Sequence, residues 1–257
     1  MALNRLAFTV GVAAVGVTAL GFPLRMPVSA GQTPSTAGAP DLTGVWGILR
    51  GGGEYAPPPP GELVFRPTYA AAYTARQAAA DEAAARGQPL PPTSFCLPYG
   101  VPTMMSVAVY PVEIIQTPDQ ITIVAEAFSE VRRVYMDEPQ LEIGSVPPGY
   151  YGHSVGRWQE DTLVIDTIGI KDTVRGYRGM PHSDQMRVTE RLRLVAPDVL
   201  HDQITIDDPV VLEQPVTYTV AYRRLPGYKM VEFVCDNNRE YVDENGVIRM
   251  RLGGEER

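Results

Sequence analysis

Residues that carry common enzyme chemistry are scarce in this sequence, which has two cysteines and three histidines among 257 residues. The cysteines show neither the CxxC spacing of a redox site nor the Cys/His spacing of a zinc site. The chain also lacks the GxSxG elbow, the HExxH motif, the P-loop and the glycine fingerprint of dinucleotide binding. These absences argue against the enzyme classes that use such motifs, and we expect no metal and no cofactor.

Basic residues are also few compared with acidic residues. The sequence has 22 lysines and arginines against 30 aspartates and glutamates, and its basic residues do not cluster. Nucleic acids and anionic membrane surfaces would repel a chain of this charge. We therefore expect no nucleic-acid partner.

Long apolar runs are missing except near the N-terminus, where Leu6 to Leu20 carries no charge and follows Arg5. Val28-Ser29-Ala30 then places small residues at a cleavage site. This pattern predicts a signal peptide over residues 1–30 and a periplasmic or secreted protein without stable membrane insertion after cleavage. An uncleaved anchor is the alternative, and Pro23 argues against it.

The remaining 227 residues suit one domain. Residues 31–40 are small and proline-rich, which predicts a flexible spacer before a single β domain over 41–250. Cys96 and Cys235 are predicted to form a disulfide, because an exported pair without other thiols most simply bonds to itself. That bond would close a loop of 140 residues, worth about 4–5 kcal/mol. Two separate buried thiols are the alternative.

Hydrophobic periodicity predicts one helix and a series of short strands. The alanine-rich stretch 67–86 carries Tyr69 and Tyr73 as one narrow apolar stripe, which predicts a helix outside the core. An ordered segment begins near Asp41, and strands are expected at 112–116, 120–127, 131–136, 153–159, 162–168, 186–195, 200–206, 216–224 and 230–235. Short turns between them favour an antiparallel up-and-down barrel, which leaves no exposed strand edges.

Several charged side chains fall on the apolar faces of these strands. Glu190 lies in a row with Met186, Val188, Leu192 and Leu194, where an unpaired carboxylate is costly. The same pattern places an arginine, three further acidic residues and two tyrosines inward: Arg133, Glu126, Asp166, Asp202, Tyr218 and Tyr222. Such an interior is either a ligand pocket or a set of buried ion pairs that fix strand register.

Two sets of motifs carry a resemblance. Gly44-Val45-Trp46 resembles the Gly-x-Trp start of lipocalin-type barrels. The run from Gly156 to Thr167, with the segments Pro181–Asp184, Thr189–Arg191 and Thr205–Pro209, is similar to a widespread group of exported bacterial proteins. The similarity spans about residues 94–240. It implies a lipocalin-like barrel and a periplasmic location, and it implies no activity and no catalytic residues.

Three functions fit this sequence. The first is a cofactor-independent lyase, isomerase or hydrolase acting on a small apolar or aromatic molecule. Its candidates are His182 as base, Glu190 or Asp166 as the carboxylate, Arg133 as anion stabiliser and His153 as a second choice. The second is a binding or carrier protein for such a molecule, and the third is a structural envelope protein. Candidate ligand contacts are Tyr135, Glu126, Tyr218, Tyr222 and Trp158. The sequence does not indicate an oligomeric state.

Overall fold

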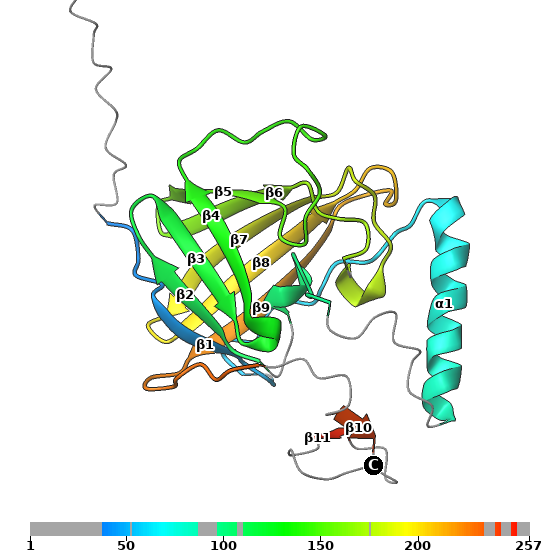
Figure 1. Ribbon diagram of the computed structural model, residues 1–257, viewed down its shortest axis with the longest axis horizontal. Coiled ribbons are helices and arrows are strands. Elements are labelled where there is room, and N and C mark those ends of the chain that lie inside the picture. Colours follow the sequence, from blue (N-terminus) through cyan, green and yellow to red (C-terminus); the bar gives the residue numbers. More distant parts are fainter. Residues whose placement is uncertain are drawn as a thin grey trace, which may run out of the picture. The chain divides into compact units, whose positions relative to one another are not determined.

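The structure, a computed structural model, describes residues 38–51, 53–86, 97–106, 110–174, 176–233, 240–242 and 248–250. Nine strands in these ranges form a closed barrel in which neighbours follow chain order and β9 returns to β1 (Figure 1). They are β1 (Gly44–Ile48), β2 (Val112–Gln116), β3 (Gln120–Ala125), β4 (Glu130–Met136), β5 (His153–Gln159), β6 (Thr162–Ile168), β7 (Arg187–Ala196), β8 (Val199–Asp207) and β9 (Val216–Arg224). The predicted signal peptide, Cys96 and Cys235 lie outside the described residues.

The predicted mainly β barrel with one helix is confirmed, and a lipocalin-like barrel fits it. One strand pair departs from the expected up-and-down order, because β4 and β5 pair in parallel while every other neighbouring pair is antiparallel. A ring of nine strands cannot alternate direction throughout, so one parallel pair is unavoidable. The connection over residues 137–152 provides it by returning the chain to the end of the barrel where β4 began.

The strand predicted at 230–235 is wrong for its described part, since residues 230–233 form no strand. This loss is what leaves the barrel with an odd number of strands. Two short strands that the sequence pattern did not predict, β10 (Glu240–Val242) and β11 (Ile248–Met250), pair antiparallel as a separate sheet.

Trp46 closes the barrel where its first and last strands meet. Its side chain is fully buried, its Nε1 donates to the Leu42 carbonyl at 2.9 Å, and Trp46 pairs with Arg224 in register. The Arg224 guanidinium lies 4.2 Å from the centre of the indole ring and donates to the carbonyls of Thr43 and Asp41. The contact combines a cation–π interaction with charge-assisted hydrogen bonds.

The alanine-rich helix α1 (Pro67–Ala85) forms as predicted, and it begins with a proline at a position where a missing N–H costs nothing. Tyr69 and Tyr73 are half-buried against the core. The Tyr73 hydroxyl and the Gln77 side-chain amide both donate to the Arg178 carbonyl at 3.1 Å. No helix within the described ranges is long and apolar enough to span a membrane.

Candidate ligand site

A buried polar network crosses the barrel interior. The guanidinium of Arg132, on β4, makes a two-pronged contact with the Glu190 carboxylate on β7, and both side chains are fully buried. The same guanidinium donates to Ser154 Oγ at 3.1 Å and Thr167 Oγ1 at 2.9 Å. Each buried charge therefore has an opposite charge and hydrogen-bond partners, the condition under which an interior ion pair is tolerated.

Asp202 is the second acidic group of the interior. It is fully buried on β8, and neither carboxylate oxygen has a hydrogen-bond partner among the described residues. Burial raises its pKa well above the usual range, the nearby Glu190 charge raises it further, and Arg132 opposes both effects. A buried carboxyl group without a partner takes up a proton, because the charged form loses its hydration.

Two tyrosines of β9 lie beside Asp202. Burial is the main cause that raises the pKa of both Tyr218 and Tyr222 well above the usual value, and Asp202 is the next. The Tyr222 hydroxyl donates to the Met105 carbonyl, whereas the Tyr218 hydroxyl makes no hydrogen bond of ordinary geometry to any residue that the structure describes. Ser106 lies close enough to Tyr218 to lower its pKa slightly, but its own hydroxyl donates to the Thr103 carbonyl at 3.1 Å. Both tyrosines therefore stay protonated.

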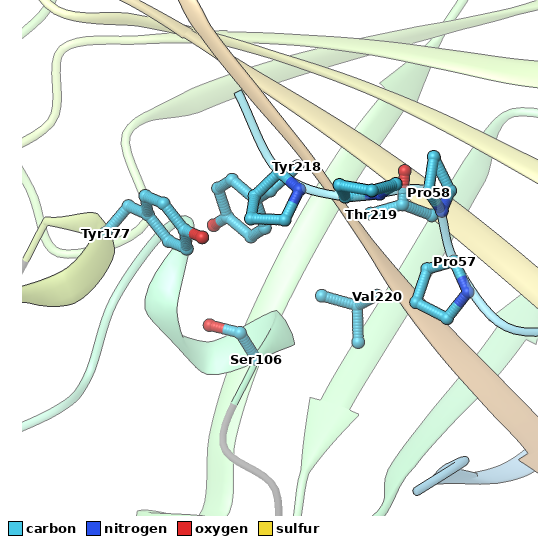
Figure 2. Close-up of a pocket in the computed structure, with 9 residues that line it drawn as sticks. Pro57, Pro58, Ser106, Tyr177, Tyr218, Thr219 and Val220 are labelled. Carbon is cyan, nitrogen blue, oxygen red and sulfur yellow. The ribbon is translucent and has the colours of Figure 1, made fainter. Parts of the chain in front are cut away.

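A hollow of about 420 Å³ opens at one side of this region (Figure 2). The Tyr177 and Tyr218 rings stack at 3.9 Å between centroids with a 10° tilt, and they form part of its wall. Its lining consists of four prolines, two tyrosines and three smaller residues: Pro57, Pro58, Pro59, Pro60, Ser106, Tyr177, Tyr218, Thr219 and Val220. The walls are therefore largely apolar.

The hollow lies where the seam between β1 and β9 is incomplete. β1 pairs with β9 only from Arg224 back to Tyr222, and Leu49 N–H then donates to the Ala221 carbonyl at 2.8 Å. The next contact along this edge is Gly61 N–H to the Thr217 carbonyl at 2.7 Å. Between these two contacts the chain passes through the four prolines, which have no N–H and cannot continue the sheet.

The structure confirms some inward orientations and corrects others. Glu190, Tyr218 and Tyr222 point inward as predicted. The inward assignment of Arg133 is wrong, because Arg133 is exposed and its neighbour Arg132 points inward. The two arginines are adjacent, and residues of one strand alternate between its faces. Asp166 is also misassigned, since it pairs across the outer surface with Arg187 at 2.7 Å instead of approaching Glu190.

Four other predicted residues lie away from the hollow. Tyr135 and His153 are half-buried and stack on each other, with 5.6 Å between ring centroids. Glu126 follows β3 and accepts from the Tyr228 hydroxyl at 2.9 Å and from the Val231 N–H at 3.1 Å. It therefore anchors the segment after β9. Trp158 is partly buried and packs against the hydrophobic core.

His182 does not meet Glu190, so the predicted acid–base pair does not form. The His182 ring nitrogens face the Ser183 and Val174 carbonyls at 3.0 and 3.1 Å, and both Glu190 oxygens bind Arg132. Ser183 in turn donates from its N–H and its hydroxyl to Asp208, at 2.6 and 2.8 Å. Two motifs that carry the sequence resemblance thus bind each other and hold a loop in place.

Sequence reasoning missed Arg132, Tyr177, Ser106 and the prolines of the hollow. The alternating register of β4 contains a signal for Arg132, because Val134 and Met136 occupy the same face. Within the described ranges, His, Asp and Glu side chains do not gather in groups of three that could hold a metal ion. A scan against protein-family models finds no match to the chain, and a search of curated proteins finds no significant match.

Proposed function

We propose that this protein binds a small apolar or aromatic molecule in the hollow beside Tyr177 and Tyr218, without converting it chemically. The observation that carries the proposal is a hollow of about 420 Å³ with aromatic, proline and valine walls beside the barrel core. Ligand sites in proteins range over roughly 300–1,000 Å³ and are mostly lined by apolar and aromatic side chains.

Binding without conversion fits the state of the titratable groups. The ring nitrogens of His182 and the oxygens of Glu190 are occupied by other groups of the chain. Asp202 and Tyr218 stay protonated because burial raises the pKa of each. A general base needs a free acceptor within reach of the substrate, and none of these four groups offers one at the hollow.

The proposed place of action is the periplasm or the extracellular space. The support is the N-terminal sequence, in which an uncharged apolar stretch follows Arg5 and ends before Val28-Ser29-Ala30. Mass spectrometry of the protein produced with residues 1–30 included, after cell fractionation, tests this location. The expected mature chain begins at Gly31 and is found outside the cytoplasm, and a chain that stays in the cytoplasm with residues 1–30 intact would contradict the proposal.

A fluorescence titration with N-phenyl-1-naphthylamine, a neutral aromatic dye, tests the binding site. The protein should enhance the dye emission with saturation, and Val220→Phe should abolish this enhancement because its larger side chain fills the hollow. The control is Val195→Phe, which places the same ring at an exposed position of another strand. Near-UV circular dichroism verifies that both variants are folded. Equal dye binding by Val220→Phe and the unmodified protein would refute the assignment of the hollow.

A further inference from the structure

One backbone edge of β9 faces the hollow. In an antiparallel strand, alternate residues direct their N–H and C=O groups to the same side. The Thr217 and Ala221 carbonyls both accept hydrogen bonds on the side of β1, from Gly61 and Leu49. Thr219 lies midway between them, so its N–H and its carbonyl point to this same edge. Figure 2 shows Thr219 beside Pro58 in the wall of the hollow.

In the described ranges, no hydrogen bond reaches the N–H or the carbonyl of Thr219 on this edge. The pairing of β1 with β9 ends before Thr219, and the facing segment is Pro57–Pro60. Proline offers no N–H to the Thr219 carbonyl. The edge therefore presents one donor and one acceptor, side by side, between apolar walls. Backbone groups in such surroundings are costly to leave unpaired.

The gap sets the size of the complementary group. Thr217 and Ala221 are four residues apart along an extended strand, which corresponds to about 13 Å. Hydrogen bonds at both ends of this gap are already made within the chain. A single amide group with its ring fits between them, whereas a long peptide strand would have to displace these bonds.

We propose that the hollow selects ligands with a cyclic secondary amide, whose N–H donates to the Thr219 carbonyl and whose carbonyl accepts from the Thr219 N–H. This inference rests on the proposed binding function and names the ligand class. The ring of such a ligand lies against the prolines and Tyr177. The two hydrogen bonds repeat the pattern by which one strand residue pairs with another, and the main chain supplies both.

Three aromatic probes of similar size separate the contributions of the ring and the amide. They are 2-quinolinone, which has the N–H and the carbonyl, N-methyl-2-quinolinone, which lacks the donor, and naphthalene, which has neither a donor nor an acceptor. Dissociation constants are measured by NMR titration of the complete protein. We expect 2-quinolinone to bind about 2- to 12-fold more tightly than its N-methyl derivative, the effect of one hydrogen bond.

Thr219→Pro removes the backbone donor and leaves the ladder to β8 intact, because the Thr219 N–H points to the opposite edge. This variant should reduce the preference for 2-quinolinone over naphthalene, because only the hydrogen bond from the ligand N–H to the Thr219 carbonyl remains. The matched control is Thr219→Val, which deletes the side-chain hydroxyl, keeps the backbone pair and should keep the preference. In the unmodified protein, the Thr219 amide proton should shift downfield with 2-quinolinone and not with naphthalene, a measurement that does not depend on either variant folding.

The outcomes distinguish this inference from the binding function. If none of the three probes binds, the proposed function itself fails for aromatic molecules. If all three bind equally well, the hollow remains a ligand site and the amide assignment falls. If Thr219→Val reduces the preference as much as Thr219→Pro, the hydroxyl and not the backbone recognises the ligand, which overturns the inference.

Discussion

Replacing one member of the buried Arg132–Glu190 pair should destabilise the barrel strongly, whereas replacing both should not. Arg132→Met leaves a carboxylate at a fully buried position, and Glu190→Leu leaves a guanidinium there. Breaking a buried ion pair in this way typically costs about 3–5 kcal/mol. The double variant leaves no unpaired charge, because both members of the ion pair are gone. The hydroxyls of Ser154 and Thr167 keep a partner, since they still hydrogen-bond to each other at 2.9 Å. Its free energy of unfolding should lie within about 2 kcal/mol of the unmodified protein.

Urea unfolding followed by far-UV circular dichroism measures the four free energies of this double-mutant cycle. We expect a coupling energy of at least about 3 kcal/mol. The control cycle uses Arg223 and Asp198, an ion pair at 3.1 Å in which each side chain is about half exposed. Exposed pairs contribute about 0–1 kcal/mol, so this cycle should be nearly additive. Additive destabilisation by Arg132→Met and Glu190→Leu would show that burial of the pair has been misjudged.

Three further expectations concern the same fold. The pKa of Asp202 is higher in the folded than in the unfolded protein. Its contribution to the free energy of unfolding is therefore fully present below about pH 4 and is lost as the pH rises toward the folded-state pKa. Between about pH 4 and the folded-state pKa, Asp202→Asn should therefore gain stability relative to the unmodified protein by up to about 1.4 kcal/mol per pH unit. A difference in unfolding free energy that stays constant from pH 4 to 8 would contradict this expectation. Removing both α1 contacts to the Arg178 carbonyl with Tyr73→Phe and Gln77→Ala should accelerate hydrogen exchange over residues 176–180, and unchanged exchange would mean that the helix does not hold this turn. Thiol titration of the oxidised protein in denaturant should detect no free thiol if Cys96 and Cys235 are bonded, and two titratable thiols would disprove the disulfide.

The barrel and part of its interior follow from local patterns in the sequence. Period-two alternation is a local property, and it correctly directs Glu190 and Asp202 to the inside. The pattern of β4 is ambiguous, because Val131, Val134, Tyr135 and Met136 place apolar residues on both faces. The folded barrel buries Arg132, and not Arg133, against Glu190. A strand whose two faces are both apolar thus hides the orientation of its charges.

The hollow could not be predicted because it depends on contacts distant in sequence. Pro57–Pro60 indicates only an irregular loop, and nothing nearby in the sequence places this loop against Thr219 and Val220. The parallel β4–β5 pair is equally non-local, since it follows from the number of strands in the ring. The failed His182–Glu190 pairing has the same origin, because the Arg132 side chain reaches Glu190 from a strand 58 residues earlier.

The meeting of Trp46 and Arg224 has a consequence for truncated forms of this protein. The Arg224 side chain binds the Thr43 carbonyl across 181 residues of chain, so the first strand gains its second neighbour only when nearly the whole domain is present. A premature stop codon between the end of β2 and residue 216 would leave β1 and the last complete strand as two bare sheet edges. Such edges pair readily with other chains. Shortened gene products should therefore aggregate or be degraded instead of persisting as smaller working domains.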